Sequence, residues 1–384
     1  MKSPLHLYVH IPYCLHKCAY CDFNSHAQPR PPWDDYLKAV RSDIAYRASQ
    51  PRFKDRQLNS IYFGGGTPSL APASLIRKIM EETDKYFSIA DNIEISLEAN
   101  PGVADSERLT AYREAGVNRL SIGAQSFRDD ELAWLERIHS AKDIKRAFQT
   151  ARLAGFKNIS LDLIYGLPGQ NLETWLDSLK TAIDLKPEHF SCYQLTIEPH
   201  TLLAARHNKV PLKLPNDEQS LDFLFSTRKR LEDTAYEAYE ISSFCRAGFR
   251  CRHNDAYWLY DDYIGIGPGA SGKWDKTDGD VHRYTNIKRP DAYIQASQSN
   301  QFVGSEEILA KSRAAAEAVW LGLRRRHGIR RDAFSSRFDA DVWSLFSQQL
   351  QPWLNSGHLH LSRDALSLTD SGLTIADSIA LSLI

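Results

Sequence analysis

Three cysteines near the amino end have the residue type and spacing of a metal centre. Cys14, Cys18 and Cys21 form a C-x3-C-x2-C pattern within the phrase HIPYCLHKCAYCDF. Cysteine thiolates are the usual ligands of iron–sulfur clusters, and three of them hold a 4Fe–4S cube by three corners, which leaves one iron for a substrate or cofactor. From spacing alone two other interpretations stay open: a zinc site completed by His16 or His26, and thiols that share no ligand.

The composition limits the classes to which this chain can belong. Its 384 residues carry 47 Lys and Arg against 48 Asp and Glu, so no overall field steers it to nucleic acid or an anionic membrane. The segment 310–384 contains the basic run 324–327, yet its net charge of about +2 is too small for a dedicated phosphate-binding domain. We therefore expect no nucleic-acid partner.

The sequence also indicates a compartment. No apolar run approaches the roughly 20 residues that span a bilayer, and the start, MKSPLH, lacks the apolar stretch of a signal peptide. Three crowded and three dispersed cysteines (Cys192, Cys245 and Cys251) favour metal or redox chemistry over disulfides in a reducing environment. We expect a cytoplasmic protein with no transmembrane segment, which leaves room for transient membrane association.

Short β-rich runs must position these thiols. They recur about every thirty residues over the first two hundred, at 5–11, 61–63, 93–97, 119–122, 159–164 and 190–197. Between them lie segments of helical periodicity, such as 33–44 and 172–183. Strict alternation of this kind predicts an α/β fold with a parallel sheet, and six repeats fit a partial (β/α)6 barrel better than a closed eight-fold one.

After about residue 200, the expected strands and helices no longer alternate at regular intervals. A good helix over 314–325 is followed by four leucines around the turn-prone segment 362–365, which predicts a small winged-helix-like domain. We expect three parts: the partial barrel with the cysteine loop at 1–205, a barrel extension and linker at 206–305, and the winged-helix-like domain at 306–384.

Glycines and polar side chains follow several of the expected strands. The glycines 64–66 let backbone approach a ligand with no Cβ in the way, while Glu98, Gln125 and Asp162 each come after a strand. Strand ends of a parallel β/α protein gather at one rim, here together with the cysteine loop. Taken singly, such a carboxylate is as typical of a helix cap, and such glycines of a turn. Their joint occurrence indicates a site.

Six ordered blocks carry a family resemblance over nearly the whole chain. Besides the cysteine loop they are YVHIP (8–12), GGGTP (64–68), EANP (98–101), GAQSF (123–127) and DLIYGLPGQ (162–170). The cysteine spacing after a first strand resembles the radical S-adenosylmethionine (SAM) superfamily. The set of blocks resembles the oxygen-independent coproporphyrinogen III oxidase family within it.

The resemblance implies roles for the matching residues. Cys14, Cys18 and Cys21 would ligate a 4Fe–4S cluster, and Tyr8, Tyr20, Gly65 and Glu98 would contact the SAM bound to it. Gly66, Thr67, Gln125, Arg137 and Asp162 match positions that hold a second SAM molecule in the oxidase. Arg137 is placed only by its distance after Gln125 and by the phrase ERIH (136–139).

Two departures argue against the oxidase reaction. The oxidase carries a fourth cysteine two residues after its third, where this chain has Phe23. The oxidase also has a long segment before its first strand, whereas only residues 1–4 precede the first strand here.

A further phrase resembles the heme chaperones called HemW, which are relatives of the oxidase. Residues 253–258 read HNDAYW and match the H-N-x-x-Y-W phrase of that branch. The resemblance assigns heme binding to His253, Asn254, Tyr257 and Trp258. An imidazole can ligate iron and aromatic rings offer flat apolar faces, although a lone histidine or aromatic pair is more often part of a core.

The resemblance implies a heme chaperone that hands heme to apoproteins, such as respiratory heme proteins, and that uses a 4Fe–4S cluster and SAM. Enzyme activity stays open, because cleavage of SAM to a 5′-deoxyadenosyl radical is chemically available, and we assign no catalytic side chain. The first alternative is a coproporphyrinogen III oxidase that forms protoporphyrinogen IX by oxidative decarboxylation. The second is a DNA-binding iron–sulfur regulator, which the near-neutral charge disfavours.

Overall fold

The six expected strands lie side by side in one sheet. The structure is a computed structural model that describes residues 4–103 and 105–383. Within these residues the largest sheet has the order β14-β13-β12-β11-β1-β4-β5-β6-β7-β8-β10-β9. Its centre is the parallel set β1 (Leu5–Ile11), β4 (Gln57–Gly65), β5 (Ser88–Ala99), β6 (Arg119–Gln125), β7 (Ile159–Tyr165) and β8 (His189–Gln194). The expected α/β fold with a partial parallel barrel is confirmed.

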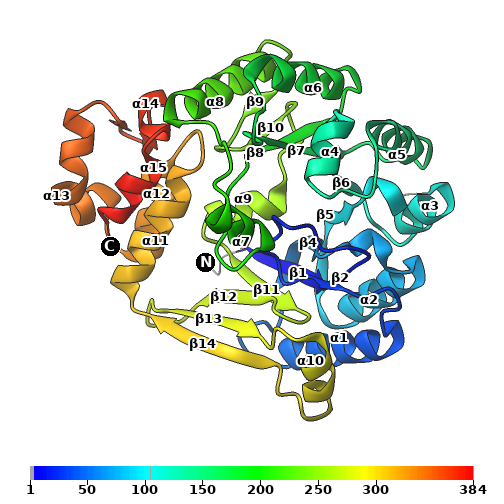
Figure 1. The fold of residues 1–384 in the computed structure, drawn as a ribbon. Helices are drawn as coiled ribbons and strands as arrows, with labels where there is room; N and C mark the ends of the chain where they lie inside the picture. The colour runs from blue at the N-terminus through cyan, green and yellow to red at the C-terminus, as the bar shows by residue number, and fades with distance from the viewer. Residues whose placement is uncertain (1–3, 104, 384) are drawn as a thin grey trace.

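Helices cover the outer face of these strands (Figure 1). They are α1 (Trp33–Ala48), α2 (Ala73–Tyr86), α3 (Ser106–Glu114), α4 (Asp129–Trp134), α5 (Ala141–Leu153) and α6 (Leu172–Asp184). Local sequence sets their ends: Ser140 and Asp143 form a capping box at the start of α5, and Gly155 takes a positive φ of 88° just after its end.

Side-chain alternation gives the sheet an apolar outer face and a polar inner face. In β1, Leu7 and Val9 pack toward the helices in the main apolar core, whereas the intervening His6, Tyr8 and His10 belong to the other face. The other central strands repeat this pattern with inner residues such as Ser60, Glu94, Ser96, Ser121, Ser160, Asp162 and Ser191. The barrel interior is therefore lined by polar groups that hydrogen-bond one another.

Later strands extend the sheet at both edges. Next to β1 lies a further parallel strand, β11 (Asp262–Ile266), followed by antiparallel β12 (Ser271–Asp275), β13 (Val281–Asn286) and β14 (Val303–Leu309). Next to β8 lie β10 (Ser243–Cys245) and β9 (Glu237–Ala238). Sequence patterns missed β11 because Gly265 and the glycines that follow the strand weaken its signal. A Cβ on Gly265 would meet Ser271 O at 2.0 Å, so packing requires glycine there.

The carboxyl-terminal residues build a smaller unit with an apolar core of its own. It contains α11 (Lys311–Leu323), α12 (Arg331–Phe338), α13 (Val342–Asn355), α14 (Asp370–Leu373) and α15 (Ala376–Leu381). A small sheet joins β15 (Ile329–Arg330), β17 (Ala365–Leu368) and β16 (Leu359–Leu361), so the expected hairpin around 362–365 is present. The expected helix over 314–325 begins three residues earlier and ends two earlier.

The remaining elements are short or connect the larger ones. They are β2 (Tyr13–Cys14), β3 (His26–Ala27), α7 (Leu202–Lys209), α8 (Asp217–Glu232), α9 (Arg252–Trp258), α10 (Pro290–Ala296) and the 3-10 turns η1 (Pro68–Leu70), η2 (Pro101–Val103) and η3 (Ser297–Ser299). Among the residues described, none of the helices has the length and hydropathy needed to cross a bilayer.

Candidate functional site

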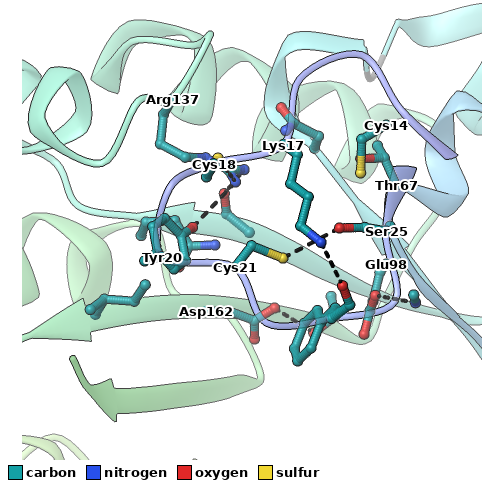
Figure 2. A pocket seen from close by; sticks show the side chains of 18 of the residues that line it. Cys14, Lys17, Cys18, Tyr20, Cys21, Ser25, Thr67, Glu98, Arg137 and Asp162 are labelled. Carbon is teal, nitrogen blue, oxygen red and sulfur yellow. Dashed lines mark hydrogen bonds between the residues drawn. The ribbon is translucent and has the colours of Figure 1, made fainter. Parts of the chain in front are cut away.

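The three cysteines of the loop after β1 open onto one cavity of about 530 Å³ (Figure 2). Thr67 Oγ1 donates to Cys14 Sγ over 3.4 Å, the Arg137 guanidinium lies 3.7 Å from Cys18 Sγ, and Cys21 Sγ lies 3.6 Å from Ser25 Oγ. Burial raises the pKa of the Cys14 and Cys18 thiols.

The arrangement of donors tests the two metal interpretations. Within the part of the chain that the structure describes, no three Cys, His, Asp or Glu side chains close around a single ion. His16 Nε2 contacts a Glu136 carboxylate oxygen at 3.4 Å, and His26 Nε2 contacts Asn24 Oδ1 at 3.3 Å. A 4Fe–4S cluster needs only the three thiolates that line this cavity, because each binds a separate iron atom, whereas a zinc site would need a fourth ligand as well.

The glycines at the end of β4 allow the backbone to come into close contact with the cysteine loop. A Cβ on Gly66 would lie 2.9 Å from Cys14 Sγ and from Tyr13 O, so any side chain there would displace the loop. Gly65 has a φ of +123°, a conformation that L side chains rarely adopt. The segment is held by Gly66 N–H donating to Ile11 O and by Thr67 N–H donating to Tyr13 O. The glycines thus form a cradle beside Cys14.

Glu98 ends β5 inside this cavity. One carboxylate oxygen accepts from Gly65 N–H over 3.1 Å and the other from Tyr62 OH over 3.0 Å. Burial raises the pKa of Glu98 to about 7, because loss of water penalises the charged form more than these two hydrogen bonds favour it. A cationic ligand beside Glu98 would favour the carboxylate.

A second group of polar residues forms the far wall. Gln125 adopts a φ of +67°, and it lines the cavity together with Arg137 and Asp162. Arg137 donates to Tyr20 OH over 3.4 Å and to Gly123 O over 3.3 Å, while its buried Nε has no hydrogen-bond partner in the described chain. Because Arg137 lines the cavity, its guanidinium places a positive charge beside any ligand bound there.

Asp162 lies deeper in the barrel. Its carboxylate accepts from Ser121 Oγ over 2.8 Å and from Ser160 Oγ over 3.0 Å. Burial raises the pKa of Asp162, although these hydroxyl donors oppose the shift. The cavity therefore combines sulfur donors of the loop with carboxylates on β5 and β7. The expectation that Glu98, Gln125 and Asp162 follow their strands was wrong, because each lies within its strand.

Most of the predicted SAM-contacting residues line this cavity, and one does not. Its lining includes Tyr20, Gly65, Gly66, Thr67, Glu98, Gln125, Arg137 and Asp162. Tyr8 lies outside the lining: its hydroxyl contacts His10 Nδ1 at 2.9 Å, and its ring stacks on Tyr62 with centroids 6.2 Å apart. Tyr8 therefore supports the residues around Glu98 through Tyr62.

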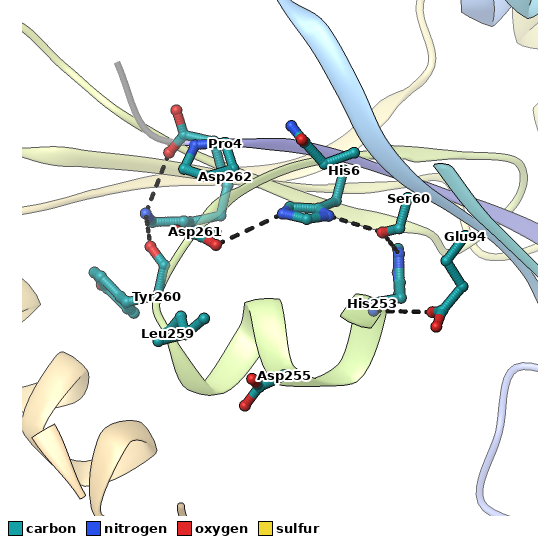
Figure 3. Close-up of polar contacts among 12 residues, drawn as sticks. Pro4, His6, Ser60, Glu94, His253, Asp255, Leu259, Tyr260, Asp261 and Asp262 are labelled. Carbon is teal, nitrogen blue, oxygen red and sulfur yellow. Dashed lines mark hydrogen bonds and ion pairs between the residues drawn. The ribbon is translucent and has the colours of Figure 1, made fainter. Parts of the chain in front are cut away.

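The HNDAYW phrase forms α9, and its histidine is sealed inside the barrel (Figure 3). His253 is 1% exposed, with Nδ1 2.8 Å from Ser60 Oγ and Nε2 2.9 Å from Tyr257 OH. Its ring stacks on Tyr62 at 5.1 Å. Glu94 accepts from the backbone N–H of His253 and so anchors the start of α9. Direct ligation of iron by this imidazole requires one of these two hydrogen bonds to break, because the ligating nitrogen must be free.

The other residues of the phrase face different surroundings. Asn254 lines the large cavity, whereas Tyr257 lines a separate cavity of about 180 Å³. The Arg324 guanidinium lies 4.7 Å from the centre of the Trp258 ring, and the indole Nε1 is buried with no partner among the described residues. Only Asn254 of the four therefore reaches the cavity of the cysteines.

Sequence reasoning missed several residues of the barrel interior. Tyr62, Arg119, Ser121 and Ser191 also line the cavity, and Arg119 is 1% exposed. The available signal was the polar residue at every second position of each strand, which the apolar runs obscured.

The chain matches two family models and several curated proteins. The family model described as the radical SAM superfamily matches residues 8–182, and the HemN C-terminal domain model matches residues 309–375. A curated protein of Haemophilus influenzae, named heme chaperone HemW, is 46% identical over 76% of this chain and 76% of its own length. A Bacillus subtilis protein of the same name is 35% identical over 99% of this chain and 98% of its own.

A solved structure resembles the whole chain. It is the coproporphyrinogen III oxidase HemN of Escherichia coli, described as a radical SAM enzyme. The likeness has a TM-score of 0.84 at 25% identity and covers 100% of this chain and 90% of that one.

Proposed function

The chain belongs to the family of the curated HemW heme chaperones, within the radical SAM superfamily, and we propose on this premise that it binds heme and transfers it to apoproteins. The observation that carries the proposal is that Cys14, Cys18, Cys21 and the Glu98 carboxylate all line one cavity. Membership of the superfamily implies a 4Fe–4S cluster and SAM. The heme acceptors that we propose are apoproteins such as respiratory heme proteins.

The chain's own residues would divide the work of holding these groups. A 4Fe–4S cluster would supply an open iron as a binding point for SAM and an electron for its reductive cleavage. We propose that Cys14, Cys18 and Cys21 hold the cluster. The SAM contacts we propose are Tyr20, Gly65, Gly66, Thr67, Glu98, Gln125, Arg137 and Asp162, with Tyr8 acting through Tyr62.

The affinity for SAM is expected to rise with pH up to about 7 and then to level off. Glu98 has a pKa of about 7 in the free chain, and a cation beside it lowers that pKa, so binding below pH 7 must release a proton. The affinity contributed by Glu98 should therefore fall by up to about tenfold per pH unit below pH 7. Calorimetric titration of the reconstituted chain between pH 5.5 and 8.5 measures this slope.

Two variants isolate the contribution of Glu98. Glu98→Gln cannot release the proton, so its slope below pH 7 should disappear. Glu136→Gln is the matched control, because Glu136 lines the same cavity but its hydrogen bond from Arg206 lowers its pKa. An unchanged slope in Glu98→Gln contradicts a SAM contact at this carboxylate.

For heme we propose that the HNDAYW residues His253, Asn254, Tyr257 and Trp258 take part in binding. Asn254 is the member that lines the cavity as it stands. Ligation by His253 requires α9 to move, because the imidazole is buried and its ligating nitrogen must give up a hydrogen bond. Burial lowers the pKa of His253 well below its ordinary value, so the side chain is neutral, as an iron ligand must be.

The carboxyl-terminal unit holds α9 in place through a charged pair. The Arg325 guanidinium lies 2.7 Å and 3.2 Å from the two oxygens of Asp255, with both side chains largely buried. Arg325→Met is expected to cost about 2 kcal/mol of unfolding free energy, because it leaves the Asp255 charge without its partner. Hydrogen exchange should show faster opening of α9 amides in this variant.

A surface pair provides the control for Arg325. Arg330 pairs with Asp332, and both side chains are well exposed. Arg330→Met should leave urea denaturation and α9 exchange unchanged. If the two variants behave alike, the Asp255–Arg325 pair does not tie α9 to the carboxyl-terminal unit.

One anaerobic preparation separates chaperone from oxidase. The chaperone predicts saturable binding of hemin and no decarboxylated product from coproporphyrinogen III, with reductant and SAM supplied. The oxidase rival, favoured by the likeness to HemN, predicts turnover of that porphyrinogen. Turnover without hemin binding contradicts our proposal.

The proposal also covers organisation and location. We propose three parts, 1–205, 206–305 and 306–384, and the match of the HemN C-terminal domain at residues 309–375 supports the last boundary.

Thiolates that hold a cluster must stay reduced, so we place the protein in the cytoplasm. Transient contact with a membrane during transfer to a membrane-bound acceptor is part of this proposal.

A further inference from the structure

A ring of exposed apolar side chains surrounds the mouth of the cysteine cavity. Leu15 (43% exposed), Phe23 (58%), Ile138 (54%) and Tyr193 (43%) all line that cavity. We call these four residues the collar. Large apolar side chains that gather in the open at one place, rather than singly, mark binding surfaces.

The collar differs in chemistry from the walls below it. The deeper cavity is lined by carboxylates, the Arg137 guanidinium and small hydroxyls, which suit a polar, charged ligand such as SAM. The collar is apolar, and three separate segments supply it: the cysteine loop, the segment after α4 and the end of β8. Its ligand therefore lies above the polar walls, next to the cysteine loop.

Two side chains that carry nitrogen groups, Lys17 and His16, lie beside the collar. Lys17 donates from Nζ to the backbone O of Phe23 over 3.1 Å, and Figure 2 shows its amino group reaching back toward the loop near Ser25. His16 has a 48% exposed side chain and contacts Glu136, two residues before Ile138. The mouth thus offers apolar area, the half-buried ammonium group of Lys17 and an exposed imidazole together.

This combination matches heme more closely than any other ligand of the proposed function. We propose that heme binds at the collar, with its macrocycle on Leu15, Phe23, Ile138 and Tyr193, a propionate on Lys17 and its iron ligated by His16. The inference rests on the proposed function and specifies where on the chain heme binds. Unlike His253, His16 requires no movement of α9, and its contact with Glu136 would orient the imidazole.

Hemin titration of the anaerobically reconstituted full-length chain tests the collar. Phe23→Ser and Ile138→Ser should each weaken hemin binding about tenfold, and the double variant about a hundredfold, because each loses apolar contact with the macrocycle. Leu153→Ser is the matched control: Leu153 is 86% exposed at the end of α5 and should have no effect. His16→Ala should shift the Soret band, since the axial ligand is lost.

Further variants show whether a loss of hemin affinity comes only from damage to the cysteine loop. Ile138 and Tyr193 lie outside the cysteine loop, so Ile138→Ser with Tyr193→Ser should lower hemin affinity while iron and sulfide content stay at the wild-type level. Lys17→Met should weaken binding a few-fold and reduce its dependence on salt.

The outcomes separate the inference from the function. If the wild-type chain does not bind hemin, the proposed function fails. If it does bind, and the collar variants bind equally well, the collar inference fails while the function stands, and loss confined to His253→Ala would move the site to α9. Collar variants that bind hemin normally but no longer deliver it to an apoprotein would make the collar a protein-docking surface and overturn the inference.

Discussion

Cys18→Ser is expected to lower the iron content of the reconstituted chain from about four atoms to below one, with a parallel loss of sulfide. Cys18 is one of the three proposed sulfur ligands that line the cavity, and a serine hydroxyl is a hard donor that replaces a soft thiolate poorly. Iron and sulfide analysis, with absorption spectra of oxygen-free material, measures the loss.

Cys245→Ser is the matched control for the same chemical change. Cys245 is a buried thiol on β10, outside the cavity, and its substitution should leave the iron content at the wild-type level. Far-ultraviolet circular dichroism should show that Cys18→Ser remains folded, since its partly exposed side chain contributes little packing. Full iron content in Cys18→Ser, or about one zinc per wild-type chain, contradicts the cluster assignment.

His253→Ala is expected to lower the free energy of unfolding by about 3 kcal/mol at pH 7.5. The substitution removes a fully buried ring that stacks on Tyr62 and leaves Ser60 Oγ and Tyr257 OH without their imidazole partner. Urea denaturation of the cluster-free chain gives this difference. His360→Ala is the control, because His360 is exposed on β16 and should leave the free energy unchanged.

The difference should shrink in acid. The pKa of His253 lies well below its unfolded value of about 6.5, so the unfolded chain takes up a proton that the folded chain refuses. Stability from the neutral ring is complete above pH 6.5 and is lost as the pH falls. The gap between the wild-type chain and His253→Ala should close by about 1.4 kcal/mol per pH unit below that point. A constant gap would mean that His253 is not buried in its neutral form.

Tyr257→Phe distinguishes packing from iron ligation. The change keeps the ring of Tyr257 but frees His253 Nε2 from its hydrogen bond. If His253 ligates iron after α9 moves, hemin binding should strengthen about five-fold, because one hydrogen bond of about 1 kcal/mol no longer opposes the movement. Unchanged hemin affinity would leave His253 with a role in packing only.

Local patterns predicted the central strands well because each has its own apolar rhythm. The strand expected at 61–63 extends over 57–65, and the one at 93–97 over 88–99, so the short apolar runs marked centres rather than ends. The run at 190–197 stops as a strand at 194, where the chain leaves the sheet. The short strands β9 and β10 could not be predicted as separate strands, since two or three residues are too few to show a periodic pattern.

Part of the candidate site could likewise be predicted from local sequence, and part could not. Cys14, Cys18, Cys21 and the glycines 64–66 were found because their types and spacing are local. Glu98 and Asp162 were expected just after their strands, whereas they lie within β5 and β7 and line the same cavity from there. The polar inner faces, including Arg119, were missed because a strand's two faces are told apart only when its neighbours are known.

The sequence by itself determined the chemistry: three soft sulfur donors, a glycine cradle and alternating strands and helices, all of which depend on residues close together in the chain. Only the tertiary structure decided which side chains share a space. Ser60 and His253 are 193 positions apart, yet their hydrogen bond seals the imidazole inside the barrel. Burial depends on contacts between distant segments, so a motif that reads as an exposed iron ligand can be folded into a core.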